Sequence, residues 1–482
     1  MSIDRLTAAD VSNLRWETPA APMHIGALLI VEAAPLLDST GELRLEEIRR
    51  RLELRLSRVP ALRRKLLRTG PLQGRPIWID DSSFDITQHV RSVSLRPASD
   101  DTELLRTVER LIAAPLARAR PLWEMWFLTG VVGGRLGVLF KLHHAVADGL
   151  AAVVILSSLF DADAQAPDPA PAPWSSEPPP LPWSLLKDNA SRKLASAGGA
   201  ARVLAHPLHA GATAWALGSE VRRGLRSPAA PRTSINRPVG AGRHVRFARF
   251  DLAAIRARAH AAGGKVNDVV LDLVAGGVRE LLLERGEPAA GIQLIASVPV
   301  ALRTSVQAES LGNAVGVATV PLDLDANAGP RLESIVAATR RAKAEQRPAH
   351  IQALMAWLAT TPVAQAFITR QRLVNLFVTN VPGPPIPIYL LGARVLDVVP
   401  IVSPAGNVTT AFCAFSYAGC LYLVATVDAS GFPDVDRLME GATRAWRDLC
   451  HADQAQTTRR DAHTGETSAR LDRATHAYVG AL

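Results

Sequence analysis

The chain has 482 residues, of which 48% are hydrophobic, and it carries a formal net charge of +9. This length and composition indicate a soluble globular protein with about two to four domains. Three cysteines without paired spacing argue against a disulfide framework, and the N-terminus lacks the apolar core of a secretory signal, so we expect a cytoplasmic protein.

The first half of the chain alternates between strand and helix patterns. An apolar run predicts a strand over residues 25–31, and apolar residues at helical spacing predict helices over 43–56 and 103–112. A second apolar run, 136–142, predicts a buried strand, and the run 150–156 after it predicts a helix. Between these last two elements lies a strand-to-helix turn.

The turn carries the sequence His-His-Ala-Val-Ala-Asp-Gly over residues 143–149. If strand alternation continues into it, His144 lies on the face of Leu142 and His143 lies on the other face, so the two imidazoles point apart. An imidazole has an ordinary pKa of about 6.5 and is largely neutral near neutrality, so it can accept a proton from a hydroxyl. One of the two histidines is therefore a candidate general base.

The last two residues of the motif have candidate supporting roles. Asp148 could fix the tautomer of an imidazole or anchor the turn through a basic partner. Gly149 allows the backbone to bend tightly or a substrate to come close.

Two other kinds of site can be weighed against the general base. His143, His144 and Asp148 form only part of a metal-ligand set, and no His-x-His or Cys-x-x-Cys pair lies nearby to complete it, so we expect no metal. No Gly-x-Ser-x-Gly elbow is present, and the three cysteines fall in sequence that is typical of core strands or helices. A covalent acyl-enzyme is therefore unsupported.

A different composition follows the first half. Residues 161–182 are rich in proline and are expected to be extended rather than packed. The alanine-rich stretch to about residue 227 is expected to be helical. The segment from Lys187 to Arg237 contains nine basic and two acidic residues, so most of the excess positive charge of the chain lies in it.

The second half again alternates strands and helices. The expected strands are 244–250, 292–298, 315–322, 376–379 and a hairpin of 408–417 with 420–427; the expected helices are 252–262, 332–346 and a long helix that follows Asn267 and stops at Gly286. Prolines interrupt the long charge-free stretches, so we expect any membrane contact to be peripheral.

These elements divide the chain into four parts. We predict an N-terminal domain with the histidine motif, a linker with the basic segment, a C-terminal domain, and a polar tail without stable structure, over residues 1–160, 161–240, 241–452 and 453–482.

The complete His-His-x-x-x-Asp-Gly pattern resembles the acyl-CoA-dependent acyltransferase superfamily, and more of the chain resembles its bacterial wax ester synthase/diacylglycerol acyltransferase branch. The stretches that carry this resemblance are Thr18 to Gly26, Arg120 to Glu124, Asn236 to Gly240, Val266 to Leu271 and Asn380 to Pro384. Two departures are visible, because Asp272 and Thr379 stand where that family more often has a small residue and a serine.

The resemblance implies a fold and a set of site residues. The fold is α/β, with two chloramphenicol-acetyltransferase-like domains, each a mixed sheet flanked by helices, and an active-site channel between them that passes His144. The second histidine, His144, is implied as the base. Asn267 and Asp268 are implied to shape the channel, although a helix N-cap with an acidic first turn explains the pair equally well. Arg303 is nominated by analogy as the partner of Asp148.

The implied reaction moves a long-chain fatty acyl group from acyl-CoA to the hydroxyl of diacylglycerol or of a long-chain alcohol. General-base catalysis and proximity suffice for a thioester, so we expect no cofactor besides the acyl-CoA substrate. We expect peripheral contact with a membrane or lipid-body surface and no nucleic-acid partner. The alternatives are a condensation-type enzyme that uses carrier-bound acyl groups and a catalytically silent lipid-body coat protein.

Overall fold

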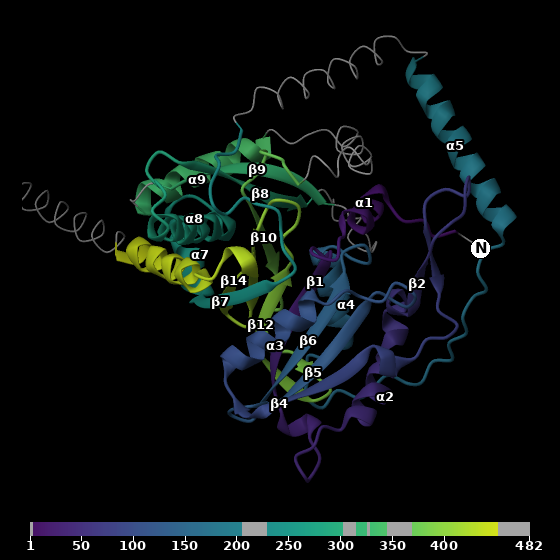
Figure 1. Cartoon of the computed structure of the whole chain (residues 1–482). Coiled ribbons are helices and arrows are strands. Elements are labelled where there is room, and N and C mark those ends of the chain that lie inside the picture. Colours follow the sequence, from purple (N-terminus) through teal and green to yellow (C-terminus); the bar gives the residue numbers. More distant parts are fainter. Residues whose placement is uncertain (1–2, 205–228, 302–314, 325–327, 345–368, 452–482) are drawn as a thin grey trace, which may run out of the picture.

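The computed structural model describes residues 3–204, 229–301, 315–324, 328–344 and 369–451. Figure 1 shows the two halves of the chain lying side by side, each built on its own sheet, with the N-terminal half in purple and blue and the C-terminal half in green and yellow. The expected pair of mixed-sheet α/β halves is confirmed.

The first sheet has six strands in the order β11-β12-β1-β6-β5-β4. Its strands are β1 (His24–Glu32), β4 (Val90–Ser99), β5 (Trp123–Val131), β6 (Arg135–His143), β11 (Tyr389–Leu390) and β12 (Ala393–Val402). Strands β1 and β6 lie at its centre and are buried on both faces, which is why their sequences are nearly continuous apolar runs. They pair antiparallel, with His24 opposite His143.

The helices of the first half are α1 (Ala8–Trp16), α2 (Leu45–Arg55), α3 (Asp101–Ala113), α4 (Gly149–Leu159) and α5 (Pro182–Leu204), and a small hairpin is formed by β2 (Arg64–Leu67) and β3 (Ile77–Asp80). Helix α3 begins where Asp100 accepts a hydrogen bond from the backbone of Glu103, and it buries an apolar face in the core. Its last turn lies near the buried ammonium of Lys141, which donates to two carbonyls at the C-terminal end of the helix.

The second sheet also has six strands, in the order β7-β14-β13-β10-β8-β9. Its strands are β7 (Arg243–Asp251), β8 (Gln293–Ala301), β9 (Val315–Asp323), β10 (Leu376–Pro382), β13 (Thr410–Tyr417) and β14 (Cys420–Asp428), and its helices are α7 (Leu252–Ala261), α8 (Val266–Glu284), α9 (Ala328–Ala344) and a last helix over residues 435–451. The expected hairpin of β13 and β14 is confirmed, with its turn at Ala418 and Gly419.

One strand of the C-terminal half belongs to the first sheet. Strand β12 pairs antiparallel with β1, from Ile25 opposite Val402 to Val31 opposite Val395. The sequence did not lead us to expect a strand here. An apolar run shows that a segment is buried, but it does not show which sheet the segment joins.

Carboxylate side chains join the two sheets at further places. Glu109 of α3 is buried and accepts hydrogen bonds from the backbone of Val245 at 2.8 Å and from Arg246 at 3.0 Å, both on β7. Asp397 of β12 accepts from Tyr422 of β14 at 2.8 Å. Together with β12, these contacts fix the second half against the first.

The proline-rich segment after α4 is extended, as expected, but the expectation that it is unpacked is wrong. Asp161 contacts the buried Arg55 at 2.6 Å, and Asp168 contacts both Arg51 and Arg55. These ion pairs hold the start of the segment on α2. The tail over 453–482, the basic residues of 205–228 and Arg303 lie outside the described residues.

Candidate active site

The histidine motif lies on the predicted strand-to-helix turn. Strand β6 ends at His143 and helix α4 begins at Gly149. Asp148 is the N-cap of α4, and its carboxylate accepts a hydrogen bond from the backbone of Ala151 at 2.9 Å. The turn therefore has a fixed shape, and Asp148 contributes to it as a structural anchor.

The His143 ring is fully buried and faces a charged cluster. Its Nδ1 accepts a hydrogen bond from the backbone of Ala145 at 2.9 Å, so in the neutral ring the proton lies on Nε2. That nitrogen is 3.5 Å from a carboxylate oxygen of Glu17, and the ring also lies edge-on to His24. Neither nitrogen of His143 is placed to take a proton from a substrate.

The His144 ring is only partly buried and has a different partner. The amide nitrogen of Asn13 lies 3.3 Å from its Nδ1 and 3.4 Å from its backbone carbonyl oxygen. Burial lowers the pKa of the His144 imidazole, and a hydrogen bond to its own backbone carbonyl opposes that shift only in part. The ring is therefore neutral near pH 7, which is the state that a general base requires.

Gly149 lies beside the second half of the molecule. Its φ is outside the left-handed region, so the backbone does not require glycine there. A Cβ on Gly149 would meet only Val381 of β10, at 3.6 Å. Of the two roles expected for Gly149, a tight backbone bend is therefore not required. The contact with Val381 shows that the motif faces the junction of the two halves.

The prediction that Asn267 caps α8 is wrong. The N-cap is Lys265, and the carboxylate of Asp268 reaches back to accept from the Lys265 backbone at 2.7 Å. Asp268 also accepts from the hydroxyl of Thr339 at 2.7 Å and is buried. Its contacts are those of a structural residue.

The unusual Asp272 has a buried partner. Its carboxylate accepts two hydrogen bonds from the guanidinium of Arg331 on α9, at 2.7 and 3.1 Å. Burial raises the pKa of Asp272, and Arg331 opposes that rise. This departure from the family pattern therefore joins α8 to α9 and does not involve the histidine motif.

Sequence reasoning missed the residues that surround the two histidines. Glu17 lies at the end of α1, close to His143, His24 and Arg118. Burial opposes its charge, but hydrogen bonds and charges from His143 and Arg118 lower the pKa of Glu17 to about 2. Burial and the charge of Lys141 lower the pKa of His24 to about 3. No spacing rule connects α1 with a motif more than a hundred residues away.

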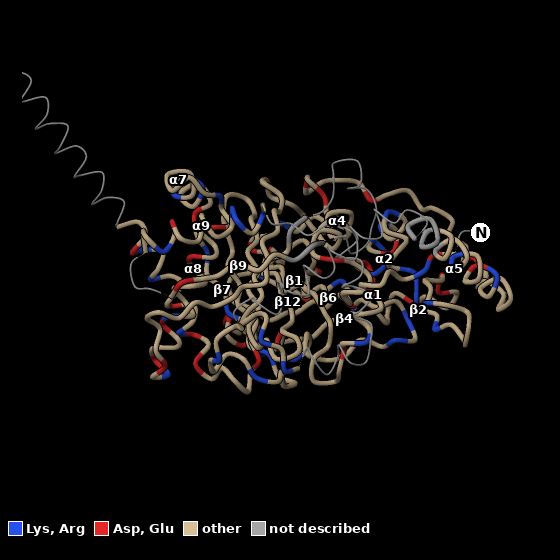
Figure 2. Tube along the Cα trace, turned by 90° about the horizontal axis from the view of Figure 1, so that it is seen from above, with Lys and Arg blue, Asp and Glu red and all other residues tan. Residues whose placement is uncertain are grey.

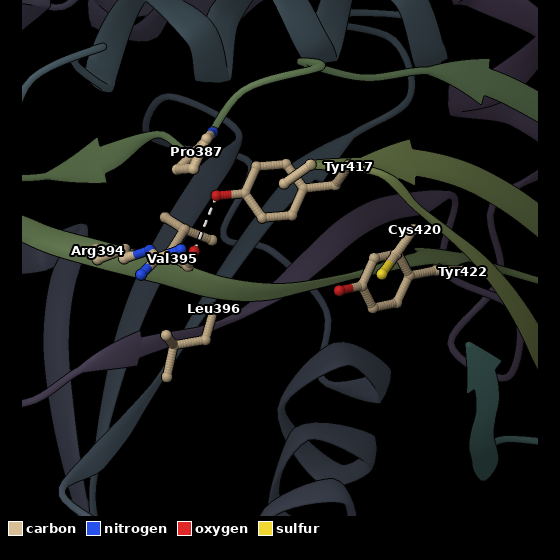
Figure 3. Close-up of a pocket in the computed structure, with 8 residues that line it drawn as sticks. Pro387, Arg394, Val395, Leu396, Tyr417, Cys420 and Tyr422 are labelled. Carbon is tan, nitrogen blue, oxygen red and sulfur yellow. Dashed lines mark hydrogen bonds between the residues drawn. The ribbon is translucent and has the colours of Figure 1, made fainter. Parts of the chain in front are cut away.

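Two further observations bear on where chemistry takes place. Among the described residues, no three His, Cys, Asp or Glu side chains come together as a metal site would require. A cavity of about 220 Å³ lies beside Arg394, Tyr417 and Tyr422, and Figure 3 shows the Tyr417 hydroxyl donating to the Val395 carbonyl at its wall. This cavity is at the Val395 end of β12, roughly 20 Å along the sheet from the histidines.

Comparisons with known proteins agree with the family resemblance that the histidine motif indicates. The wax ester synthase/diacylglycerol acyltransferase catalytic domain matches residues 6–270, and the C-terminal domain of the same family matches residues 311–449. A Mycobacterium bovis protein named as a diacylglycerol O-acyltransferase is 32% identical over 417 residues, which cover 83% of this chain and 81% of that protein. The chain belongs to the wax ester synthase/diacylglycerol acyltransferase family. It is therefore an acyltransferase.

Other relatives agree with this assignment. The Mycobacterium tuberculosis protein named diacylglycerol O-acyltransferase tgs1 is 31% identical, over 91% of this chain and 94% of its own length. The solved wax ester synthase/diacylglycerol acyltransferase of Marinobacter aquaeolei has the same fold, with a TM-score of 0.66, 22% identity, and coverage of 92% of this chain and 98% of that one. The starter condensation domain of rhizomide synthetase, solved with C8-CoA, shares the fold at a TM-score of 0.57 and 14% identity, over 93% and 94% of the two chains.

Proposed function

We propose that this acyltransferase moves a long-chain fatty acyl group from coenzyme A to the hydroxyl of diacylglycerol or of a long-chain alcohol, with His144 as the general base. The observation that carries the proposal is the neutral, partly buried imidazole of His144 on a turn that faces the second half. Both substrates reach this turn through a channel between the two halves.

The reaction requires one proton acceptor and close placement of two substrates. The neutral imidazole of His144 takes the proton of the acceptor hydroxyl while the hydroxyl oxygen attacks the thioester carbonyl. The carbon–sulfur bond then breaks, and the proton passes from His144 to the coenzyme A thiolate. A thioester is already activated, so a positioned base, worth typically 10² to 10⁴ in rate, together with proximity is sufficient. The mechanism asks for no cofactor.

The acceptor is found by a direct assay. Purified protein is incubated with radiolabelled palmitoyl-CoA and, in separate reactions, dioleoylglycerol, hexadecanol and a free amino acid. We expect labelled triacylglycerol, wax ester or both, and no labelled amide. Transfer to the amino acid alone would favour a condensation-type reaction, and no transfer to any acceptor would favour a silent lipid-binding protein.

We also propose that α5 docks the enzyme on an anionic membrane or lipid-body surface. No helix in the described parts of the chain is long and apolar enough to cross a membrane. One face of α5 packs on the first half, where Leu185 is buried and Asp188 contacts Arg5 at 2.6 Å. The rest of the helix extends away from the two sheets (Figure 1).

The outward face of α5 has the composition of an interfacial helix. Trp183, Leu186 and Leu194 are 61%, 41% and 73% exposed and lie on one side of the helix. Lys187 and Lys193 flank this apolar stripe, and Figure 2 shows basic positions along α5 and at the neighbouring β2. An apolar stripe between basic residues binds a lipid surface through burial of the stripe and attraction to anionic headgroups.

Liposome flotation tests this docking surface. We expect the wild type to float with liposomes that contain phosphatidylserine at low salt, and to float less at high salt or without phosphatidylserine, because salt screens the attraction. The triple variant Trp183→Ser, Leu186→Ser, Leu194→Ser should not float. The control Leu283→Ser removes an exposed leucine from α8 and should behave as the wild type. Equal partitioning of the wild type with and without phosphatidylserine, at low and at high salt, would show that α5 is an ordinary solvated helix.

A further inference from the structure

More than half of the large apolar side chains that the described residues expose lie at one edge of the first half. The backbone of Glu177 donates to Asp80 of β3 at 3.1 Å, so the proline-rich segment runs beside the β2–β3 hairpin before it enters α5. Six of the eleven exposed side chains belong to these three segments: Leu72 between β2 and β3, Trp174 and Leu181 in the proline-rich segment, and Trp183, Leu186 and Leu194 on α5. Single exposed apolar residues are ordinary, but a concentration of them in one place marks a binding surface.

Leu72 lies at the tip of the hairpin and is 76% exposed. The chain turns between Gly70 and Gln73, where the Gln73 backbone donates to the Gly70 carbonyl at 3.2 Å. Leu72 has a φ of +64°, in the left-handed region that favours glycine. A leucine at this place gains no burial within the chain and has an unfavourable backbone conformation. The folding of the hairpin therefore does not account for Leu72, whereas a contact outside the chain does.

The hairpin tip and α5 are joined by hydrogen bonds. The side-chain amide of Asn189 on α5 donates to the Leu72 carbonyl at 2.7 Å. Arg5 contacts both elements, because its guanidinium donates to the Arg75 carbonyl at 2.8 Å and to the carboxylate of Asp188 at 2.6 Å. Figure 1 shows α5 beside this hairpin at the outer edge of the first half. The tip and the helix therefore present their exposed side chains as one unit.

Positive charges surround this apolar edge. Arg68 and Arg75 are exposed in the loop on either side of the tip, and Lys187 and Lys193 are exposed on α5. In the part of the chain that the structure describes, neither Arg68 nor Arg75 forms an ion pair with a carboxylate. The edge thus combines outward apolar side chains with unpaired cations, which matches the surface of an anionic lipid layer. The cores of protein interfaces are instead depleted of charged residues.

We propose that the loop over residues 68–76 is a second lipid-contacting element, whose tip residue Leu72 enters the interface of an anionic membrane or lipid body beside α5. The inference rests on the proposed docking through α5 and adds a contact to it. A helix that lies alone on a lipid surface can turn about its own axis. A second contact from the hairpin fixes the orientation of the enzyme on that surface.

Flotation with phosphatidylserine liposomes measures the contribution of the loop. We expect Leu72→Ser to weaken binding about fivefold or more, because a leucine side chain is no longer buried in lipid. Arg68→Gln combined with Arg75→Gln should weaken binding at low salt about fivefold per charge, and should have little effect without phosphatidylserine. Leu283→Ser removes an exposed leucine from α8, far along the chain from this edge, and should bind as the wild type does.

A fluorescent label at the tip reports insertion directly. Nitrobenzoxadiazole is attached to Leu72→Cys in a chain that also carries Cys420→Ser and Cys450→Ser. Burial raises the pKa of Cys413 to about 12, so this third cysteine stays unreactive. We expect liposomes with spin-labelled acyl chains to quench the label at the tip. The same label on Leu283→Cys should not be quenched.

The outcomes separate this inference from the docking proposal. If the wild type does not float under any condition, docking through α5 is wrong and the inference falls with it. If the wild type floats and the α5 triple variant does not, an unquenched label on Leu72→Cys overturns only the role of the loop. Full binding by Leu72→Ser overturns that role as well. A label that responds to protein concentration and not to lipid would assign the edge to a second copy of the chain.

Discussion

Two adjacent histidines have different chemistry because each ring is fixed by a different neighbour. The backbone of Ala145 donates to Nδ1 of His143 and so places the proton of that ring on Nε2, toward Glu17. The His144 ring instead lies beside Asn13, whose amide nitrogen is 3.3 Å from its Nδ1. Strand alternation predicted two different environments for the rings, but it could not name Asn13 or Glu17, because both come from a distant helix.

Replacing the proposed base should reduce catalysis without unfolding the protein. We expect His144→Ala to lower kcat by at least ~10², the low end for a lost general base, while the melting temperature and acyl-CoA binding stay near wild type. His143→Ala should instead cost about 1 to 3 kcal/mol of stability, because it leaves the buried N–H of Ala145 without its acceptor. Steady-state kinetics and urea unfolding of both variants measure this.

The reverse pattern would reassign the base. If His143→Ala lost its turnover while His144→Ala kept it, the base would be His143. If both variants kept most of their turnover, general-base catalysis by this motif would be disproved.

At the scale of elements, helix ends determine where the site residues lie. Asp148 caps α4 and thereby ends the turn that carries the histidines. At the start of α8, the capping carboxylate is Asp268, three residues into the helix, and Asn267 only follows the first helical residue. The sequence predicted both helices and their approximate starts. It misassigned the second cap because two adjacent residues, Asn267 and Asp268, are both good capping residues and only the backbone path decides between them.

A pair of substitutions separates the cap from a charge effect at Asp148. Asp148→Ala should lose about 0.5 to 2 kcal/mol of stability and part of its activity, because the Ala151 N–H loses its acceptor. Asp148→Asn keeps a side-chain oxygen that can cap the helix and should retain most of both. Urea unfolding and turnover report the two effects. If Asp148→Asn were as damaged as Asp148→Ala, the negative charge would be essential and an ion pair with Arg303 would be favoured.

On the scale of the whole molecule, local patterns predicted most elements and not their arrangement. The strands at 25–31 and 136–142 appear as β1 and β6, and the hairpin of β13 and β14 lies where the sequence places it. The transfer of β12 to the first sheet was missed, because strand pairing across the chain leaves no mark on either strand alone. The buried ion pairs of Arg55 with the proline-rich segment were also missed, because a contact between distant segments leaves no mark on either segment alone.

The contact of Glu109 with β7 should contribute measurably to stability. We expect Glu109→Ala to cost about 1 to 3 kcal/mol, because the buried N–H of Val245 loses its acceptor. Glu109→Gln keeps an oxygen for that N–H and should cost less. Urea unfolding followed by circular dichroism gives both values. Equal losses in the two variants would show that the charge pairing with Arg246 dominates, and no loss in either would show that the Glu109 contact does not stabilise the junction.

The position of β12 also bears on how the protein is synthesised. When the last residue of β6 has been added, roughly 260 residues remain to be made before β12 is complete. At about 5 to 20 residues per second, this takes roughly ten to fifty seconds. Throughout that time β1 has its β6 partner on one side and an unpaired, strongly apolar edge on the other. Such an edge pairs readily with other chains. The nascent first half therefore needs protection from aggregation until β12 has been made and pairs with the free edge of β1.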